Sequence, residues 1–324
     1  MRTFSDQREN RMKKTIALLA AGLLLLSACG EKQPVPETPD EPTPMVVQYI
    51  PPAEPAPEPA PTLSFTPTVE PGGITFASDE LDGWELNGGS AARKNVSISD
   101  LLSKPYGFTF SSSGPQVLIY HTHTSEAYTA SEGYEYKASE PYRTLDPEHS
   151  VVRVGEEIAS VLRECGIEVI HDTEFNDYPD YEASYDTALP RVKKILQENP
   201  SIKLVIDVHR DACLYNGEQL AYRKTVNGEQ TAQVLLVCGD GGRQGYPGWK
   251  DNLSWDLKMC AQLNRDAPEL LRSVRLDFAR YNQHVLSGAM LVEIGAAGNT
   301  LPEAITAGRL FGQSLASMIL SLTK

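Results

Sequence analysis

Short apolar runs alternate with amphipathic segments over the C-terminal part of the chain. The runs at 116–121, 203–208 and 289–293 are rich in aliphatic residues, which is typical of strands covered on both faces of a sheet. Segments 150–165 and 302–322 place apolar residues at helical spacing. Strands that alternate with helices predict βαβ crossovers. We therefore expect an α/β fold, a three-layer sandwich whose central sheet is mixed and mostly parallel.

Weaker patterns predict the remaining elements. We expect strands at 167–171 and 233–238, a helix at 188–198, and a helix at 253–263 that continues, after a break at Pro268, to residue 274. The polar and aromatic stretch 127–148 is predicted to be a long connection between a strand and a helix. Long loops beside an active site often bind the substrate.

The first 93 residues have a different composition. A basic start, an apolar run at 15–26 and Cys29 follow one another in the order of a signal peptide with a bacterial lipobox. We predict that residues 1–29 are this signal and that Cys29 is lipidated, with an uncleaved anchor helix or a plain signal peptide as alternatives. Residues 30–93 are predicted to be a disordered, Pro-rich tether. The domain at 94–324 would then lie outside the cytoplasm, anchored to the membrane.

Charge and cysteine content exclude some classes of function. The net charge of −14 argues against nucleic acid as a partner. No P-loop and no GxGxxG motif follows the first strand, so nucleotide binding has no support. None of the cysteines forms a CxxC pair, which disfavours a structural zinc knot. A disulfide through Cys213 stays open for an exported protein.

Three of the predicted strands end in residues that can bind a metal or move a proton. The first strand ends at His121 and leads to His123 and Glu126, which form an H-x-x-E motif; the others end at His209 and Glu293. The carboxyl edge of an open α/β sheet is where ligands bind. Catalytic zinc takes three protein ligands and leaves a position open for water. We therefore predict Zn²⁺ bound by His123, Glu126 and His209.

The other residues at these strand ends receive supporting roles. Glu293 is predicted to be the general base and acid, and Arg210 or His121 to stabilise the oxyanion of a tetrahedral intermediate. His121 is alternatively a ligand or a donor behind the ligands, since residues i and i+2 of a strand share a face. Glu148 is an alternative source of the carboxylate ligand. A lone histidine at a strand end is more often structural, and only the recurrence at several strand ends favours a metal site.

These motifs resemble the signature of the stage II sporulation protein P family of endospore-forming bacteria. The resemblance covers about residues 116 to 324 and rests on segments spread along this range: His121–Tyr128, Asn176–Pro179 with Ser184–Tyr185, Asp207–Ala212, Tyr281–Gln283, and Leu291–Gly295 with Asn299. Two features depart from the family pattern. The chain has a lipobox where family members carry an N-terminal membrane helix, and His284 stands where an acidic residue is expected.

The resemblance carries expectations about activity and partners. The family is similar to zinc-dependent N-acetylmuramoyl-L-alanine amidases, which implies an amidase-like fold. It also implies hydrolysis of peptidoglycan between N-acetylmuramic acid and L-Ala, with endopeptidase action on cross-links as a second activity. It places the protein in engulfment during sporulation, beside the lytic transglycosylase stage II sporulation protein D. On the family pattern, His123, His209 and Glu293 match the two zinc histidines and the catalytic glutamate, and Glu126 is the first choice for the third ligand.

Two other functions fit the same residues. A zinc metallocarboxypeptidase also uses H-x-x-E with a distant His and Glu, and Arg210 would then bind the free carboxylate of its substrate. A catalytically silent, wall-binding lipoprotein would keep the fold without the chemistry. The complete set of His123, Glu126, His209 and Glu293 weighs against the second alternative.

Overall fold

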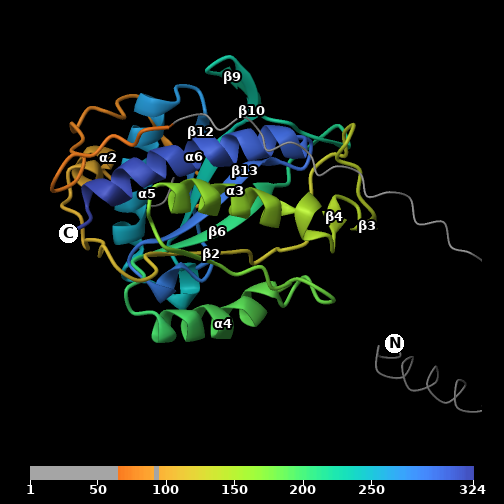
Figure 1. The fold of residues 1–324 in the computed structure, drawn as a ribbon, viewed down its shortest axis with the longest axis horizontal. Coiled ribbons are helices and arrows are strands. Elements are labelled where there is room, and N and C mark those ends of the chain that lie inside the picture. Colours follow the sequence, from red (N-terminus) through yellow and green to blue (C-terminus); the bar gives the residue numbers. More distant parts are fainter. Residues whose placement is uncertain (1–64, 91–94) are drawn as a thin grey trace, which may run out of the picture. The chain divides into compact units, whose positions relative to one another are not determined.

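The computed structural model describes residues 65–90 and 95–324, and within them one large sheet forms the centre of the fold (Figure 1). It has seven strands in the order β1-β12-β11-β13-β6-β2-β5. All neighbouring strands run parallel except β11 and β13, which are antiparallel. The prediction of a mixed, mostly parallel sheet is confirmed. In chain order the strands are β1 (Leu86–Asn87), β2 (Val117–Tyr120), β5 (Val169–His171), β6 (Leu204–Asp211), β11 (Val234–Gly239), β12 (Leu271–Asp277) and β13 (Ala289–Ala296).

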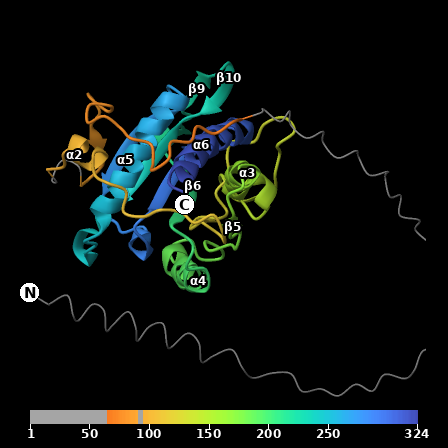
Figure 2. The same ribbon diagram turned by 60° about the vertical axis from the view of Figure 1, so that its left-hand side comes forward.

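Helices cover both faces of this sheet, which makes the three layers (Figures 1 and 2). On one face lie α3 (Val151–Glu164), α5 (Trp249–Asp266) and α6 (Leu301–Ser321), and on the other α4 (Ser184–Glu198). The alternation of side chains along each strand supplies both cores. In β2, Val117 and Ile119 join the core under α3 and α6, whereas Leu118 and Tyr120 pack with residues of α4.

Local sequence signals set the ends of these helices. Ser150 caps α3, its hydroxyl accepting a hydrogen bond from Val152 N–H at 3.2 Å. Thr300 and Glu303 form a capping box at the start of α6. The short helix α2 (Ile98–Leu102) is capped by Ser97. These signals agree with the predicted boundaries of α3 and α6 to within about two residues.

The connections carry three two-stranded hairpins. These are β3 (Ala138–Glu140) with β4 (Arg143–Thr144), β7 (Leu214–Tyr215) with β8 (Glu218–Gln219), and β9 (Arg223–Val226) with β10 (Glu229–Ala232). The first of them lies inside the stretch that the sequence pattern presents as an irregular loop.

Two predicted boundaries are wrong. The helix expected to continue to residue 274 ends at Asp266, and Leu271–Asp277 is strand β12, in which Val274 and Leu276 alternate with more exposed residues. The tether predicted for 30–93 also ends too late. Ile74 and Leu81 are buried in the main core, and Gly72 N–H donates to Ser321 O at 3.1 Å. These apolar residues are few and lack periodicity, so composition masks their packing.

The predicted signal peptide, Cys29 and most of the tether lie outside the residues that the structure describes. Among the described helices none is long and apolar enough to cross a membrane. Four cysteines are described, Cys165, Cys213, Cys238 and Cys260, and all four are free thiols.

Candidate functional site

Three neighbouring parallel strands end at one edge of the sheet and bring the predicted site residues together. β6 pairs with β2 on one side and with β13 on the other, and His209 and Glu293 are direct partners in the β6–β13 register. Because paired residues of adjacent strands point to the same face, their side chains lie on the face that α4 covers. The prediction that these strand ends meet is confirmed.

Buried carboxylates fix the loop that follows β2. Asp207 accepts a hydrogen bond from Thr122 N–H at 2.8 Å and a second from the Thr122 hydroxyl. Asp177 accepts from the Ser125 hydroxyl at 2.7 Å and lies within 3.2 Å of its backbone nitrogen. Both acids are nearly inaccessible to solvent. The loop that carries His123 and Glu126 is therefore held in one conformation at both its ends.

Glu126 lies between Arg210 and His209. Its carboxylate accepts from Arg210 N–H at 3.1 Å and from Arg210 Nη1 at 3.2 Å, and it lies 3.4 Å from His209 Nδ1. Burial alone raises the pKa of this carboxyl, but the positive charges of Arg210 and His209 outweigh it and lower the pKa to about 2. Glu126 is thus a buried carboxylate that stays ionised, as a metal ligand requires.

His209 is placed between two carboxylates. Asp207 Oδ1 lies 2.9 Å from His209 Nε2, and Glu126 Oε2 lies 3.4 Å from Nδ1, so each ring nitrogen faces a carboxylate. Burial lowers the pKa of the imidazole, but Asp207 and Glu126 together raise it well above its usual value. The ring therefore sits in a negative environment that favours a cation.

His123 is held by aromatic rings. Its ring stacks on Tyr181 with centroids 4.1 Å apart and an interplanar angle of 13°, and meets Tyr185 edge to face at 5.6 Å. The ring of His209 lies 5.3 Å away. Burial, followed by the charge of His209, lowers the pKa of His123 to about 4, and Nδ1 is buried with no hydrogen-bond partner. A neutral imidazole with an unpartnered nitrogen is a competent metal ligand.

Glu293 has the environment of a general base. Part of the residue is accessible, but Oε2 is buried with no hydrogen-bond partner. Burial, with a further contribution from the Glu126 carboxylate, raises the pKa of Glu293 to about 8. A carboxyl group whose pKa is near neutrality can both accept and release a proton under physiological conditions.

His121 and Arg210 are placed differently from the roles predicted for them. β2 ends at Tyr120, so His121 keeps the alternation of the strand and faces α3, whereas the following turn carries His123 to the other side. His121 Nδ1 lies 2.9 Å from Val208 O, and Nε2 lies 2.9 Å from His171 Nε2. Its role as an oxyanion donor stays a prediction that this arrangement does not favour.

Arg210 is buried and makes a hydrogen bond through each of its guanidinium nitrogens. Besides Glu126, its guanidinium donates to Ala127 O at 3.1 Å and to Tyr142 O at 3.0 Å. All three guanidinium nitrogens therefore have partners. This geometry makes Arg210 a residue that positions Glu126, rather than a donor available to an oxyanion.

The second candidate carboxylate, Glu148, lies apart from these side chains. It belongs to the short helical turn Pro147–His149, is exposed, and its backbone N–H is bound by Asp146. Of the two carboxylates left open by the sequence, Glu126 is the one that contacts His209.

No group of three or more His, Cys, Asp or Glu side chains within residues 65–90 and 95–324 stands arranged to hold a metal ion. The structure brings His209 against Glu126 and places His123 beside them, with His123 Nδ1 buried and unpartnered. Two imidazoles and one carboxylate are the donor set of a catalytic zinc site. The fit to zinc is therefore one of donor chemistry, not of a preformed cluster.

Several contacts of the site escape sequence reasoning. Asp177 and Asp207 fix the loop, and Tyr181 and Tyr185 pack on His123. Arg143, on β4, lies with its guanidinium 3.6 Å from the centre of the Tyr181 ring. The motifs Asn176–Pro179 and Ser184–Tyr185 that accompany the family resemblance were the one available signal, and they do not say which residues these segments contact.

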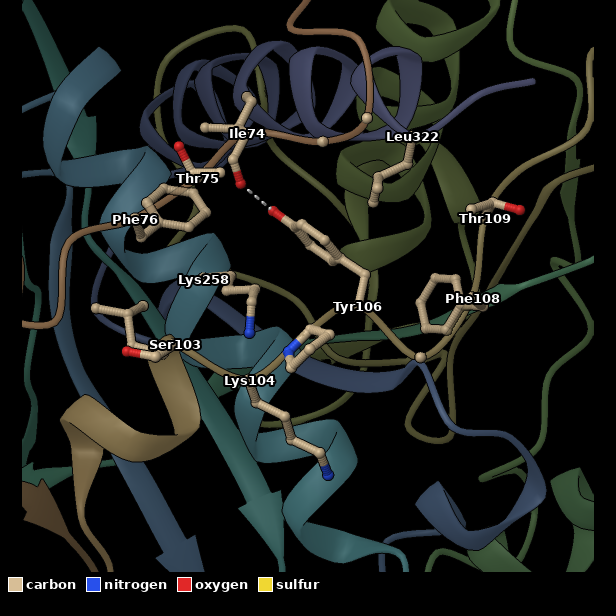
Figure 3. A pocket seen from close by; sticks show the side chains of 15 residues that line it. Ile74, Thr75, Phe76, Ser103, Lys104, Tyr106, Phe108, Thr109, Lys258 and Leu322 are labelled. Atoms are coloured by element: carbon tan, nitrogen blue, oxygen red, sulfur yellow. Dashed lines mark hydrogen bonds between the residues drawn. The ribbon is translucent and has the colours of Figure 1, made fainter.

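A well-formed cavity lies elsewhere. It has a volume of about 550 Å³ and is lined by Ile74, Tyr106, Lys258 and Leu322 among others (Figure 3). The segments that line this cavity and the hollow next to it come just before β2, just before β13 and just after α6. The cavity therefore lies toward the amino ends of the strands, opposite the site. Among its described lining residues there is no His, Cys, Asp or Glu. Chemistry, rather than cavity size, therefore locates the site.

Comparisons with known proteins identify the family to which the chain is similar. The family model "Stage II sporulation protein P (SpoIIP)" matches residues 74–316. Stage II sporulation protein P of Bacillus subtilis (strain 168) is 26% identical over 198 residues, which cover 58% of this chain and 47% of that protein. The chain thus matches about half the length of this curated relative.

Similar solved structures include N-acetylmuramoyl-L-alanine amidases. AmiC2 of Nostoc punctiforme is 12% identical, with a TM-score of 0.34, over 64% of this chain and 97% of that one. The CwlD amidase of Clostridioides difficile, solved with the GerS lipoprotein, is 11% identical with a TM-score of 0.35, over 64% and 95% of the two chains. At these scores the likeness carries no argument about the site.

Proposed function

Because the chain belongs to the stage II sporulation protein P family, we propose that it is a peptidoglycan hydrolase of the cell envelope that acts in sporulation. One observation carries the proposal. Three adjacent strand ends gather His123, His209 and Glu293; His123 Nδ1 and Glu293 Oε2 are buried without a hydrogen-bond partner, and His209 faces the Asp207 and Glu126 carboxylates. Buried polar atoms are nearly always paired, so a cluster of unpaired ones indicates a ligand or a reaction.

The proposed reaction is hydrolysis of the amide between N-acetylmuramic acid and L-Ala of the stem peptide, with cleavage of peptide cross-links as a second activity. The family, and the amidase activity for which the similar solved proteins are named, support an amide bond in peptidoglycan as the target. We propose that the enzyme depends on zinc, with His123, Glu126 and His209 as ligands. A bound Zn²⁺ would supply an activated water at neutral pH and a Lewis acid for the carbonyl group.

The residues of the chain itself account for the positioning and the proton transfer. Arg210 holds the Glu126 carboxylate in place through its backbone and its guanidinium. Glu293 takes a proton from the attacking water and passes it to the nitrogen of the leaving amine. A pKa of about 8 suits both steps, since the carboxylate is a stronger base than an exposed one and its conjugate acid still releases the proton.

Anchoring and partnership complete the proposal. Lipidation of Cys29 would tether the protein outside the cytoplasm, and the Pro-rich segment would let it reach the wall. The lytic transglycosylase stage II sporulation protein D is the proposed partner, because the family resemblance implies joint action in engulfment.

The alternative hypothesis of a metallocarboxypeptidase lacks the residue that was expected to bind the free carboxylate of its substrate. Arg210 would have to bind the free carboxylate of the substrate, but all three of its guanidinium nitrogens already bind the protein. A metallocarboxypeptidase would need another cation. Cleavage of a substrate with a blocked C-terminus separates the two activities.

The direct test is digestion of purified peptidoglycan by the full-length chain, with mass spectrometry of the products. We expect free stem peptides and peptide-free glycan, which disappear with a chelator and return with Zn²⁺. Glu126→Gln and Glu148→Gln decide between the two carboxylates, and only the first should abolish the products. Glu198→Gln, at the exposed end of α4, is the matched control.

The results separate the alternatives. Products that persist without metal would refute zinc dependence but keep the hydrolase. Cleavage restricted to peptides with a free C-terminus would establish the carboxypeptidase. Binding to the wall without any product would leave the silent, wall-binding lipoprotein.

A further inference from the structure

The hairpin β3–β4 is tied to the loop that carries the site. Thr144 N–H donates to Ser125 O at 2.8 Å, and Glu126 and Arg143 form an isolated antiparallel bridge. Ala127 N–H donates to Tyr142 O at 2.9 Å. The position of Arg143 is therefore fixed by the same backbone that fixes Glu126.

Arg143, Tyr181 and His123 form a continuous stack. The guanidinium of Arg143 lies 3.6 Å from the centre of the Tyr181 ring, whose other neighbour, His123, stacks with centroids 4.1 Å apart. A guanidinium that stacks on an aromatic ring is oriented in advance, because its plane is fixed.

The two arginines that contact this part of the site differ in how they are engaged. Arg210 is 7% exposed, and all its guanidinium nitrogens bind acceptors of the protein. The Arg143 side chain is 20% exposed, and Nη1 donates to Glu140 Oε2 at 2.8 Å. The Glu140 side chain is 63% exposed, so this pair is a surface ion pair of little stability that another carboxylate can replace.

We propose that Arg143 is a specificity-determining residue whose guanidinium binds a free carboxylate of the substrate beside the scissile amide. The proposal rests on the proposed function, since stem peptides of peptidoglycan carry such a carboxylate on their acidic second residue. Arginine suits this task because its planar donors match the two oxygens of a carboxylate. Glu140 occupies the guanidinium in the free protein and yields it to the substrate.

The test uses two synthetic N-acetylmuramoyl tripeptides that differ in one group. Both carry an amidated C-terminus, so a preference for a terminal carboxylate cannot act. In one the α-carboxyl group of the second residue, glutamate, is free, and in the other it is a carboxamide. The full-length chain, Arg143→Gln, Arg143→Lys and the control Arg153→Gln are assayed with zinc present. Arg153, on α3, pairs with Glu157 and contacts none of the site residues named above.

We expect Arg143→Gln to lower kcat/KM about 10- to 100-fold on the carboxylate substrate, mainly through KM, because a charge-assisted hydrogen bond is lost. The carboxamide substrate should change little, Arg143→Lys should be intermediate, and Arg153→Gln should match the parent chain. An equal loss on both substrates would overturn the proposal, since it would mean that Arg143 only supports the stack.

A binding measurement separates this inference from the proposed function. Titration of both tripeptides into the Glu293→Gln chain compares their affinities without turnover. A preference for the carboxylate that Arg143→Gln removes would support the inference even if neither compound were cleaved, in which case the amidase proposal alone would fail. Equal affinities for the two compounds would refute the inference whatever the activity.

Discussion

Two pairs of histidines lie on opposite faces of the same sheet, and their rings have nearly the same geometry. The centroids of His123 and His209 are 5.3 Å apart at an interplanar angle of 82°, and those of His121 and His171 are 5.2 Å apart at 66°. Neither residue type nor ring geometry distinguishes the pairs. The distinction lies in what the ring nitrogens contact.

In the pair under α3 every ring nitrogen has a partner. His121 bonds Val208 O and His171, and His171 Nδ1 lies 2.8 Å from Glu156 Oε2. In the pair at the carboxyl edge, His123 Nδ1 is buried without a hydrogen-bond partner, and the His209 nitrogens face only carboxylates, Asp207 Oδ1 at 2.9 Å and Glu126 Oε2 at 3.4 Å. The first pattern is that of a structural network. The second is that of a site whose ligand completes it, and the predictions below test this difference.

The largest expected effect concerns Glu293, the proposed base. It lies beside His123 and His209, the pair at the carboxyl edge of the sheet, which we call the edge pair. Glu293→Gln should lower the rate of hydrolysis about 10²- to 10⁴-fold, because an amide cannot accept the proton. Stability should not fall with it. Burial raises the pKa of Glu293 to about 8, so the folded state disfavours the ionised group and this destabilisation grows as the pH rises from the unfolded pKa toward 8. Glutamine removes it.

Unfolding of both chains at pH 5 and pH 8 measures this second effect. The substituted chain should gain stability relative to the parent chain at pH 8 more than at pH 5. Retained hydrolysis would show that Glu293 is not the base, and equal pH dependence would show that its carboxyl group titrates normally.

Zinc should stabilise the fold through the edge pair alone. At a free metal concentration of 100 times Kd, a ligand that binds only the folded state adds about 2.7 kcal/mol. His209→Ala should abolish the zinc-dependent rise in melting temperature, whereas His171→Leu should keep it. If His171→Leu removed the zinc-dependent rise in melting temperature, the metal would bind at His121 and His171 instead.

The pair under α3 should matter for stability and not for the reaction. His171→Leu leaves His121 Nε2 buried without a partner, which costs about 1–3 kcal/mol of unfolding free energy. Denaturant unfolding measures this loss, with Glu156→Gln as a control for the exposed end of the network. Hydrolysis per folded molecule should stay at the level of the parent chain. A loss of activity without a loss of stability would return a catalytic role to this pair.

The sequence predicts the strands that form this site better than it predicts the directions and contacts of the side chains. Hydrophobic runs that end in His121, His209 and Glu293 predict three strands, and the parallel sheet brings their ends together. The face that each side chain takes depends on where β2 ends. The strand stops at Tyr120, so the rule that i and i+2 share a face fails for His121 and His123.

Sequence patterns do not predict which segments distant in the chain contact the site residues. Tyr181 stacks on His123 from a loop, and Arg143 stacks on Tyr181 from a hairpin, and the positions of both segments depend on tertiary packing. The pattern also could not show that Ile74 belongs to the core, because the residues around it lack periodicity. Gly155 is a third example, since nothing in a helical pattern explains a glycine in its middle.

Gly155 gives the smallest and most local test of the comparison. A Cβ at this position would lie 2.7 Å from His121 Cε1 and 2.9 Å from His171 Nε2, so α3 approaches the ring pair too closely for any side chain. Overpacking costs about 1–3 kcal/mol, and the better helix propensity of alanine returns up to about 1 kcal/mol. Gly155→Ala should therefore lower the unfolding free energy by about 1 kcal/mol, measured by denaturant titration.

Gly107→Ala is the matched control, because its Cβ would meet nothing within 4 Å and it should leave stability nearly unchanged. Zinc-dependent stabilisation should survive both substitutions, since neither touches the edge pair. If Gly155→Ala also weakened zinc binding, the two pairs would be coupled through the sheet, and the division between a structural pair and a ligand pair would not hold.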